Sequence, residues 1–451
     1  MANTLHVDEI RTRFSSAMSE MYCNEVPLYN DLINLVKTVN FKVLNADPLL
    51  EEQLISTNEL NRLDVERHGA IRLGTGAELN SIRRLFAVMG MFPVGYYDLS
   101  VAGLPVHSTA FRPTDSSSLT RNPFRVFTSL LRLDLIEDRE LAAEAKKILS
   151  KRQIISARAL ELIELDTLNG GLNEEQADEF IREALETFRW HSQATVSSHT
   201  YQRLKSAHSL IADVVSFHGP HINHLTPRTL DIDLAQKTMI DEGMAVKATI
   251  EGPPKRKTKI LLRQTAFTAL EEKINFFDDI IGTHTARFGE IEQRGAALTQ
   301  KGRELYDKLL NSIDQNIKEN NSSAYLAELT KRFELFPNNL QELYDEKLIF
   351  FKYHANPKAL KNKTAGSIEE LIDVGALIIT PQIYEDFLPV SAAGIFQSNL
   401  NAKSQSNYTQ RSNQKQFEEC LGAQVFDEMW LYEETQDNSL NEALSILSRN
   451  K

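Results

Sequence analysis

Two histidines far apart in the chain lie the same distance before one tripeptide. His68 precedes the Thr-Ala-Phe tripeptide at residues 109–111 by 41 residues, and His224 precedes the Thr-Ala-Phe at residues 265–267 by the same 41 residues. A sequence match at a fixed spacing is typical of an internal duplication. A duplicated chain folds into two related modules that place equivalent residues at equivalent positions. The two histidines are therefore candidates for one shared metal site.

The composition is that of a globular protein and narrows the classes of partner. The chain has 451 residues, of which 42% are hydrophobic and 25% are charged, and its net charge is -12. This balance argues against wholesale disorder, and the negative charge repels a phosphate backbone, so we expect no nucleic-acid partner. The start, MANTLHVDEIRTRF, lacks an apolar signal core, and no apolar run is long enough to span a membrane. We therefore expect a soluble cytoplasmic protein without a membrane partner.

The cysteine count limits the kind of metal site. Cys23 and Cys420 are the only two cysteines, which excludes a disulfide framework and a zinc site built from several thiolates. Any metal must be bound by histidine and carboxylate.

The segments that follow the two histidines predict the same order of elements, which is strand, helix, strand, strand. Glycines end both predicted helices, at Gly90 and Gly243. The first series has predicted strands at 68–74, 94–100 and 104–111 and a helix at 77–89. The second has an extended stretch at His224, a helix at 232–241, strands at 245–251 and 260–267, and a further strand over 283–295 that closes the module.

These patterns predict an α+β fold of two β modules with large helical insertions. The predicted segments are an N-terminal helical layer (1–60), a first β module (61–122), a helical insertion (123–215), a second β module (216–298), and C-terminal helices and loops packed on the core (299–451). Within the insertion, Asn173 and Gln176 have the spacing of a capping box, which predicts a helix start.

The first candidate residues for chemistry are His68 and Arg72. On a strand, every second side chain points to one face, so both would lie on the same side with the small Ala70 between them. A metal ligand beside a cation is one interpretation. The alternative is a histidine on an edge strand with a surface arginine.

The segment HGPHINHLTPRT contains His218, His221 and His224, each three residues from the next. Pro220 and Pro227 leave little room for a helix that would bring all three together. One ligand is therefore a better interpretation than three, and the repeat selects His224. The roles of the other two histidines stay open.

The third candidate group is the alternating stretch of Glu290, Glu292 and Arg294. It predicts a strand face with a carboxylate and a possible guanidinium partner, or simply an alternating surface strand. Two histidines and one carboxylate form the facial arrangement that leaves positions open on iron. A zinc hydrolase could use the same ligands, but it also needs a general base, and the sequence indicates none.

Four segments resemble the 2-oxoadipate dioxygenase/decarboxylase family, also called hydroxyglutarate synthases, within the vicinal oxygen chelate group. The segments are VERHGAIRLGTG, FHGPHINHLTPR, ARFGEIEQRGAALTQKG and FLPVSAAGIF. The resemblance extends from about residue 10 to 440 and implies a vicinal oxygen chelate-like β-barrel core formed by the two modules.

The resemblance also implies the site residues. An Fe(2+) ion would be held by His68, His224 and Glu290, and the substrate would contact Arg72 and Val390 as well as the two histidines. Arg72 would bind a substrate carboxylate. Glu290 is preferred because the related 4-hydroxyphenylpyruvate dioxygenases place their ligand at the first residue of an E-I-x-Q-R pattern. Glu292 remains the alternative third ligand.

The activity implied is the decarboxylation and hydroxylation of 2-oxoadipate to 2-hydroxyglutarate and CO2, a step of lysine degradation. The partners would then be a small 2-oxo dicarboxylate and O2, and the sequence does not set an oligomeric state. Two other functions stay open. One is a non-redox metal-dependent lyase or isomerase of the same superfamily, and the other is a non-catalytic ligand-binding protein.

Overall fold

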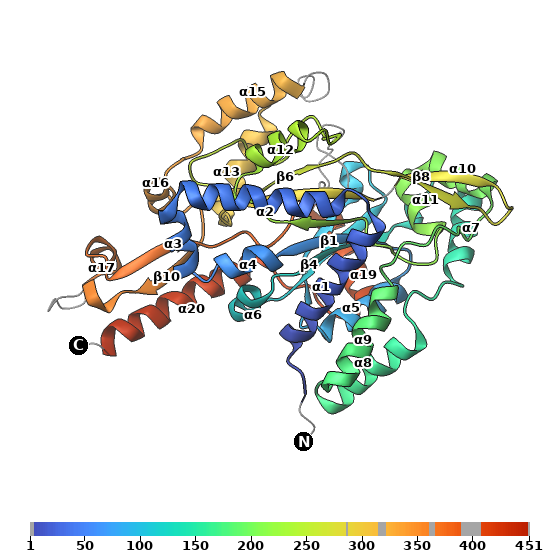
Figure 1. Ribbon diagram of the computed structural model, residues 1–451, viewed down its shortest axis with the longest axis horizontal. Coiled ribbons are helices and arrows are strands. Elements are labelled where there is room, and N and C mark those ends of the chain that lie inside the picture. Colours follow the sequence, from blue (N-terminus) through green and yellow to red (C-terminus); the bar gives the residue numbers. More distant parts are fainter. Residues whose placement is uncertain (1–3, 286, 314–321, 360–365, 389–406, 450–451) are drawn as a thin grey trace. The chain divides into compact units, whose positions relative to one another are not determined.

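The computed structural model describes residues 4–285, 287–313, 322–359, 366–388 and 407–449 (Figure 1). The chain divides into two compact units, each built from segments distant in the sequence. The first unit comprises Met1–Glu251, Gln264–Gln293 and Phe387–Val425, and the second comprises Gly252–Arg263, Arg294–Asp386 and Phe426–Lys451. The division into five sequence segments stays a prediction.

The first unit contains most of the helices. They are α1 (Val7–Glu25), α2 (Tyr29–Ala46), α3 (Pro48–Ser56), α4 (Leu60–Val65), α5 (Gly76–Ala87), α6 (Ser116–Arg121), α7 (Arg139–Leu149), α8 (Ala157–Asn169), α9 (Glu174–Glu186), α10 (Ser198–Ala207), α11 (Ser209–Val215), α12 (Ile232–Asp241) and α19 (Asn407–Leu421). Short 3-10 helices occur at Leu99–Ala102 and Leu133–Leu135. The predicted helix at 232–241 is confirmed.

A seven-stranded sheet with the strand order β2-β3-β4-β1-β5-β9-β6 forms the centre of this unit. Its strands are β1 (Arg67–Leu73), β2 (Phe92–Asp98), β3 (Val106–Arg112), β4 (Arg125–Leu131), β5 (His224–Pro227), β6 (Leu262–Ala266) and β9 (Phe288–Arg294). The sheet curls into a half-barrel. A separate antiparallel pair joins β7 (Glu271–Asn275) to β8 (Ile281–Thr285). The predicted α+β fold class is confirmed.

The sheet shows the duplication in its strand pairing. In the first module β1 pairs parallel with β4, and in the second module β5 pairs parallel with β9. The two modules join where β1 and β5 pair antiparallel. The strands that begin with the two repeated histidines are therefore neighbours at the middle of the sheet.

One strand of the first module was missed by the sequence analysis, which placed residues from 123 onward in a helical insertion. Residues Arg125–Leu131 instead form β4, between β3 and β1. Every residue of β4 is buried, so its sequence, RVFTSLL, lacks the alternation of a half-exposed strand. The first module therefore contributes four strands, β1 to β4, to the sheet rather than the three predicted.

The predicted strand at 245–251 pairs with β6 only at isolated points. The Lys247 N–H donates to the Ala266 carbonyl at 2.9 Å, and Glu251 and Gln264 exchange two backbone hydrogen bonds. The chain then turns at Gly252, where φ is +99°, and enters two prolines that have no N–H to donate. The ladder therefore cannot continue past Glu251.

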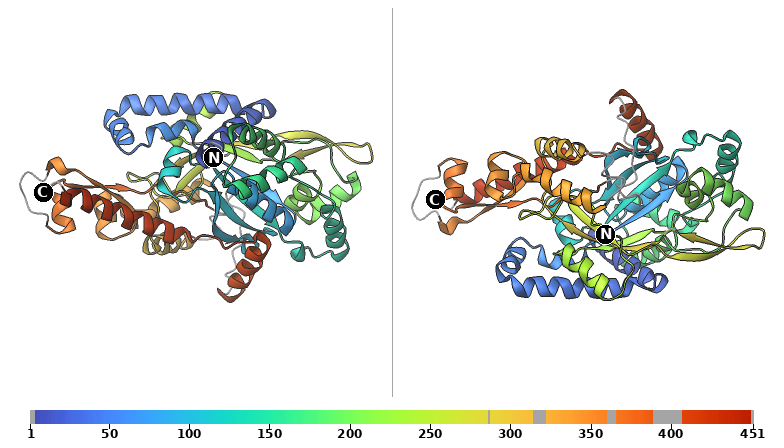
Figure 2. Two further views of the ribbon diagram at one scale, coloured as in Figure 1. Left: turned by 90° about the horizontal axis from the view of Figure 1, so that it is seen from below. Right: turned by 90° about the horizontal axis from the view of Figure 1, so that it is seen from above.

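Helix α1 supports the two strands of the second module. Its residues Ile10, Phe14 and Met18 recur every four positions and are fully buried. Tyr22, also on α1, donates from its hydroxyl to the backbone carbonyls of Asn223 at 3.0 Å and Phe288 at 2.8 Å. Helix α2 lies beside α12, as the two views in Figure 2 also show. These helices cover the outer side of the second module.

Capping side chains define the ends of several helices. The predicted capping box of Asn173 and Gln176 is confirmed at the start of α9. An equivalent box of Thr75 and Glu78 begins α5, directly after β1. Each box satisfies backbone N–H groups that the first helical turn leaves without partners.

A buried ion-pair cluster fixes the start of β1. Glu66 accepts from Arg62 Nε at 3.0 Å, and Arg125 Nη1 and Arg228 Nη1 each lie 2.9 Å from its carboxylate. Burial disfavours the charged form of Glu66, but the three guanidinium groups outweigh it and hold its pKa well below the usual value. The residue two positions before His68 is therefore held from three sides.

The second unit contains α13 (Gln300–Asn311), α15 (Ser322–Arg332), α16 (Leu340–Asp345), α17 (Ile368–Asp373), α20 (Glu428–Arg449) and 3-10 helices at Phe333–Leu335 and Pro357–Ala359. Strands β10 (Phe351–Ala355) and β11 (Leu377–Pro381) form an antiparallel pair. Arg294 donates to the carbonyls of Tyr384 at 2.7 Å and Asp386 at 2.9 Å. Among the described residues, no helix is long and apolar enough to cross a membrane.

Candidate metal centre

The three predicted ligands lie on three neighbouring strands. His68 is on β1, His224 on β5 and Glu290 on β9, and these strands are adjacent in the sheet. The register sets His68 opposite Thr226 and His224 opposite Phe288. Glu290 is then level with Thr226, because each lies two residues further along its strand. Alternate residues of a strand point to one face, so the three side chains meet on one face of the sheet.

The ligand atoms of these three residues lie within 4.8 Å of one another. The Oε2 atom of Glu290 is 3.0 Å from His68 Nε2 and 3.7 Å from His224 Nε2. The two imidazole rings are nearly perpendicular, with centroids 5.4 Å apart. All three side chains are at most 1% exposed. The group is compact and screened from water.

Several buried atoms of this group lack hydrogen-bond partners among the described residues. Neither ring nitrogen of His224 has a partner, and neither has Oε1 of Glu290. Each buried polar atom left in this way costs about 1–3 kcal/mol, and native proteins keep few of them. A metal ion bound by these atoms would remove that cost. The residues therefore fit a metal ion.

The protonation states also suit a metal. Burial lowers the pKa of His224 to about 4, so the ring is neutral at pH 7. Burial disfavours ionisation of Glu290, but His224 and His68 outweigh it and lower its pKa. A neutral imidazole and an ionised carboxylate are the forms that bind a metal. Burial also disfavours the charged form of His68, but Glu292 and Glu290 outweigh it and raise its pKa. Metal binding to His68 would therefore compete with a proton.

Glu292 lies on the other side of the His68 ring. Its Oε2 is 2.9 Å from His68 Nδ1, in an ion-pair contact rather than an aligned hydrogen bond. The two glutamates of β9 therefore approach opposite nitrogens of one imidazole. A carboxylate on the far nitrogen is the usual partner of a metal-binding histidine, because it fixes the orientation of the ring.

Two neutral side chains orient Glu290. Gln264 Nε2 donates to its Oε2 at 2.8 Å, and Thr226 Oγ1 donates to the same oxygen at 3.0 Å. Both donors come from strands that flank β9, namely β6 and β5. The carboxylate is therefore held by the sheet itself.

Aromatic rings and one lysine surround the two histidines. The ring of Phe387 packs edge-on against His68 at 5.0 Å, and Phe288 lies 4.9 Å from His224. The Lys247 ammonium lies 5.4 Å from the centroid of Phe288. Burial lowers the pKa of Lys247 to about 8, against the opposing effect of Glu290 and Glu251. The centre thus has apolar walls, and the Lys247 side chain lies against one of them.

Arg72, the predicted substrate-binding residue, lies on β1 with its side chain on the same face as His68. Its Nη1 donates to Oδ2 of Asp213 at 2.6 Å, and Asp213 belongs to α11. Val390, the other predicted substrate contact, lies outside the described residues. The described chain reaches Leu388, directly after the Phe387 that packs on His68.

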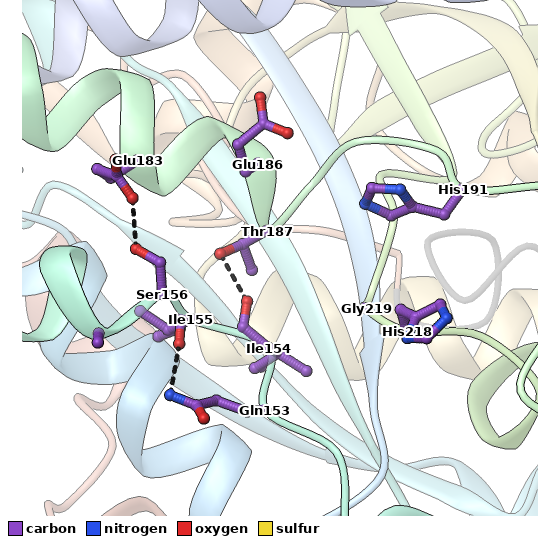
Figure 3. Close-up of a pocket in the computed structure, with 11 residues that line it drawn as sticks. Gln153, Ile154, Ile155, Ser156, Glu183, Glu186, Thr187, His191, His218 and Gly219 are labelled. Carbon is purple, nitrogen blue, oxygen red and sulfur yellow. Dashed lines mark hydrogen bonds between the residues drawn. The ribbon is translucent and has the colours of Figure 1, made fainter. Parts of the chain in front are cut away.

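The three histidines of the HGPHINHLTPRT segment have three different surroundings. His224 belongs to the ligand group, and His221 contacts Asp213 at 3.2 Å. His218 lines a separate cavity of about 430 Å³ (Figure 3). Hydroxyl groups of that cavity are already used within its walls, where Ser156 donates to Glu183 and Thr187 donates to a backbone carbonyl. The cavity therefore offers no obvious chemistry.

Comparison with known proteins identifies the family. A family model described as 2-oxoadipate dioxygenase/decarboxylase matches residues 14–399. The chain belongs to this 2-oxoadipate dioxygenase/decarboxylase family. The family resemblance inferred from the four sequence segments is therefore confirmed. The matched range contains all the residues of the candidate centre described above.

Relatives from several bacteria carry the name of the 2-oxoadipate dioxygenase/decarboxylase family. The Escherichia coli protein is 52% identical over 443 residues, covering 97% of this chain and 98% of its own length. The Mycobacterium bovis protein is 37% identical over 415 residues, or 89% of each chain. A crystal structure of the Pseudomonas putida hydroxyglutarate synthase in complex with 2-oxoadipate superposes with a TM-score of 0.92 at 50% identity, covering 99% of this chain and 100% of that one.

Some residues of the centre in this member of the family were missed by the sequence analysis. Gln264 and Thr226 gave no signal, because neutral side chains one strand away from a ligand are not distinguished by pattern. Asp213, the partner of Arg72, was missed because it is an isolated residue in its own segment.

Proposed function

We propose that this chain is an iron(II)-dependent dioxygenase that converts 2-oxoadipate and O2 to 2-hydroxyglutarate and CO2. The observation that carries the proposal is the buried group of His68, His224 and Glu290 with its unpartnered ligand atoms. The names of the relatives support the substrate, as does the bound 2-oxoadipate in the Pseudomonas putida hydroxyglutarate synthase. The equation balances without a second organic substrate, since 2-oxoadipate loses one carbon as CO2 and both atoms of O2 enter the products.

The donor set favours iron over other metals. Two histidines and one carboxylate on one face leave coordination positions for a bidentate 2-oxo acid and for O2. Iron(II) bound there would supply the electrons that activate O2 and would hold the 2-oxo acid group next to it. No reactive side chain of the protein is needed for that redox chemistry.

The protein's own residues prepare this site. Glu290 is the proposed third ligand, since its carboxylate lies beside both histidines. Glu292 is the proposed partner that orients His68, since it contacts Nδ1 and leaves Nε2 toward Glu290. The apolar rings of Phe387 and Phe288 exclude water from the reacting groups.

Arg72 is the proposed partner of the distal carboxylate of the substrate. A planar guanidinium can donate two parallel hydrogen bonds to a carboxylate, which sets its orientation as well as its position. Val390 is the proposed substrate contact from the segment that follows Phe387. Holding both ends of the substrate would keep the shortened chain in place for hydroxylation after CO2 leaves.

Product analysis under labelled oxygen tests the proposal. Iron(II)-loaded protein with 2-oxoadipate and 18-O2 is expected to consume oxygen and to form 2-hydroxyglutarate that carries two labelled atoms, with unlabelled CO2. Turnover without oxygen would show a lyase or isomerase instead. Iron binding without any turnover would show a ligand-binding protein. The metal-free protein is the control.

A further inference from the structure

A second buried cluster of two histidines and one carboxylate lies in the same unit. Asp213 on α11 accepts from His284 Nε2 at 2.8 Å, and His221 Nε2 lies 3.2 Å from the same oxygen, Oδ1. His284 is on β8, and His221 lies three residues before β5. All three side chains are at most 6% exposed. The cluster has the same composition as the candidate metal centre.

The protons of this cluster can be assigned from its hydrogen bonds. Burial disfavours ionisation of Asp213, but His221 and Arg72 outweigh it and hold its pKa well below the usual value. An ionised carboxylate only accepts, so both histidines donate from Nε2. The Nδ1 of His284 then accepts from the Tyr201 hydroxyl at 2.8 Å. The hydrogen bonds run in one direction, from Tyr201 through His284 to Asp213.

Aromatic packing holds the two histidine rings. The indole of Trp190 stacks on His284 with an interplanar angle of 7°, and His221 meets the same indole edge-on at 4.7 Å. The ring of Phe217 lies 4.8 Å from His284 and 5.7 Å from His221. Neither imidazole can rotate without displacing a packed ring. The orientation of Asp213 is therefore fixed by its surroundings.

The other oxygen of Asp213 binds Arg72. The distance from Nη1 to Oδ2 is 2.6 Å. With the Asn223 amide turned so that both of its groups are satisfied, its oxygen accepts from the same Nη1 at 3.0 Å. Both contacts are made by the same terminal nitrogen of the guanidinium. Asp213 and Asn223 therefore determine where the Arg72 side chain lies.

These contacts argue against a metal ion in the second cluster. The guanidinium already lies on the Asp213 carboxylate, and a divalent ion on Oδ1 would be repelled by it. The Nδ1 of His284 has a hydroxyl partner, and the two Nε2 atoms have a carboxylate partner. The buried ligand atoms without a hydrogen-bond partner belong to His224 and Glu290 of the first group. Among the described residues, none belongs to the second cluster.

We propose that Asp213, held by His221 and His284, is a positioning residue that fixes Arg72 for the distal carboxylate of the substrate and thereby selects a dicarboxylate of one length. The inference rests on the proposed function, because Arg72 has this role only if the substrate is a 2-oxo dicarboxylate. Asp213 acts through Arg72 and does not touch the reacting atoms.

Strand geometry explains why fixing Arg72 would select chain length. His68 and Arg72 are four residues apart on β1, so their Cα atoms are separated by about 13 Å. Arginine has many rotamers, and a mobile Arg72 could reach carboxylates at several distances from the metal. An Arg72 side chain held by Asp213 presents its donors at a single distance. Substrates of the wrong length, or without a distal carboxylate, are then rejected.

Replacement of Asp213 by asparagine tests the inference in the iron-loaded enzyme. The matched control is Asp98→Asn, because Asp98 is also a buried aspartate of this unit, at 8% exposure, and bonds to Ser100 and Asn413 instead of Arg72. Michaelis constants are measured with 2-oxoadipate, with the shorter 2-oxoglutarate and with 2-oxohexanoate, which lacks the distal carboxylate. We expect D213N to raise KM for 2-oxoadipate about 10-fold to 100-fold, the loss expected for a contact to a charged group.

The pattern across substrates separates positioning from general damage. The preference of D213N for 2-oxoadipate over the other two acids should fall by a similar factor, while kcat changes little and one iron is bound per chain. D98N should keep the preference of the wild type. An unchanged substrate preference in D213N would overturn the inference. So would a wild type that binds two metal ions per chain when D213N binds only one.

A second pair of variants, at His284, tests the same inference even if D213N does not fold. His284→Phe removes the donor to Asp213, whereas His284→Gln retains an N–H at a similar position. We expect H284F to lose substrate preference and H284Q to recover most of it, and equal preference in both would contradict the inference. If the wild type itself does not turn over 2-oxoadipate, the proposed function fails. If the wild type turns over 2-oxoadipate and these variants have no effect, the inference about Asp213 fails instead.

Discussion

Two buried clusters of this protein have the same composition, two histidines and one carboxylate, yet they differ in what their polar atoms contact. In the group of His68, His224 and Glu290, both nitrogens of one histidine and one carboxylate oxygen have no hydrogen-bond partner within the described chain. In the group of Asp213 and its two histidines, a tyrosine hydroxyl and an arginine supply the partners.

The difference shows that hydrogen-bond satisfaction, and not residue type, distinguishes a metal site from a structural network. A buried donor or acceptor without a partner is costly and native proteins keep few of them, so several such atoms gathered on histidine and carboxylate side chains favour a bound ion. The first group therefore indicates a bound ion, while the second is complete by itself. The experiments below test this contrast between the two clusters.

The largest effect is expected from removing a carboxylate of the first group. Glu290→Ala should lose the metal and lower turnover by more than about 100-fold, because loss of an outer partner alone costs about 10-fold to 100-fold. D213N should keep one metal ion per chain. Metal analysis of the purified proteins measures both. Equal metal loss in E290A and D213N would contradict the distinction between a metal-binding cluster and a structural one.

Glu292→Ala separates a ligand from a supporting group. We expect it to weaken metal affinity by about 10-fold to 100-fold without abolishing binding, because Glu292 would only orient His68. Titration with iron(II) under anaerobic conditions gives the affinity. If E292A loses the metal completely while E290A retains it, the assignment of the third ligand is reversed.

Arg72→Lys tests the connection between the clusters. Lysine keeps the charge but not the planar pair of donors, so we expect turnover of 2-oxoadipate to fall by about 10-fold to 100-fold. Iron content should stay the same, because Arg72 is not a ligand. Steady-state kinetics and metal analysis on one preparation measure the two quantities. Loss of iron in R72K would contradict the role of Arg72 in substrate binding.

Acid should weaken the second cluster through Asp213. Its pKa lies well below the usual value in the folded protein and near 3.9 in the unfolded chain. The stabilisation is therefore fully present above about pH 5 and is lost as pH falls through the folded pKa. The difference in the free energy of unfolding between the wild type and D213N should shrink by up to about 1.4 kcal/mol per pH unit below pH 4. Denaturant unfolding from pH 7 to pH 3 measures it, and a constant difference would contradict an ionised Asp213.

The smallest effects are expected from His218 and His221, the two histidines of the HGPHINHLTPRT segment that lie outside the candidate ligand group. His218→Ala should leave metal content and kinetics unchanged, because His218 lines a cavity away from the centre. His221→Ala should also keep its metal but should raise KM several-fold, since one of the two donors to Asp213 is lost. Parallel assays of the two variants compare them directly. Metal loss in H221A would show that the second cluster also binds an ion.

Much of the fold could be predicted from local patterns. The helix at 232–241 and the strand that begins near His68 follow from periodicity and capping, which are properties of neighbouring residues. Strand β4 could not be predicted, because a strand buried on both faces has no alternation. The segment at 245–251 has a strand-like sequence, but its pairing depends on β6 and on the turn at Gly252.

Sequence information alone revealed the repeated spacing, and the family resemblance of four segments indicated three candidate ligands. The repeated spacing can be counted along the sequence without knowledge of any three-dimensional contact. Two sets of contacts could be found in the folded structure alone. Glu290 and Glu292 approach opposite sides of one imidazole, and Arg72 binds Asp213, 141 residues away. Such contacts depend on strand order and helix packing, because residues of unrelated segments meet only when the modules close around them.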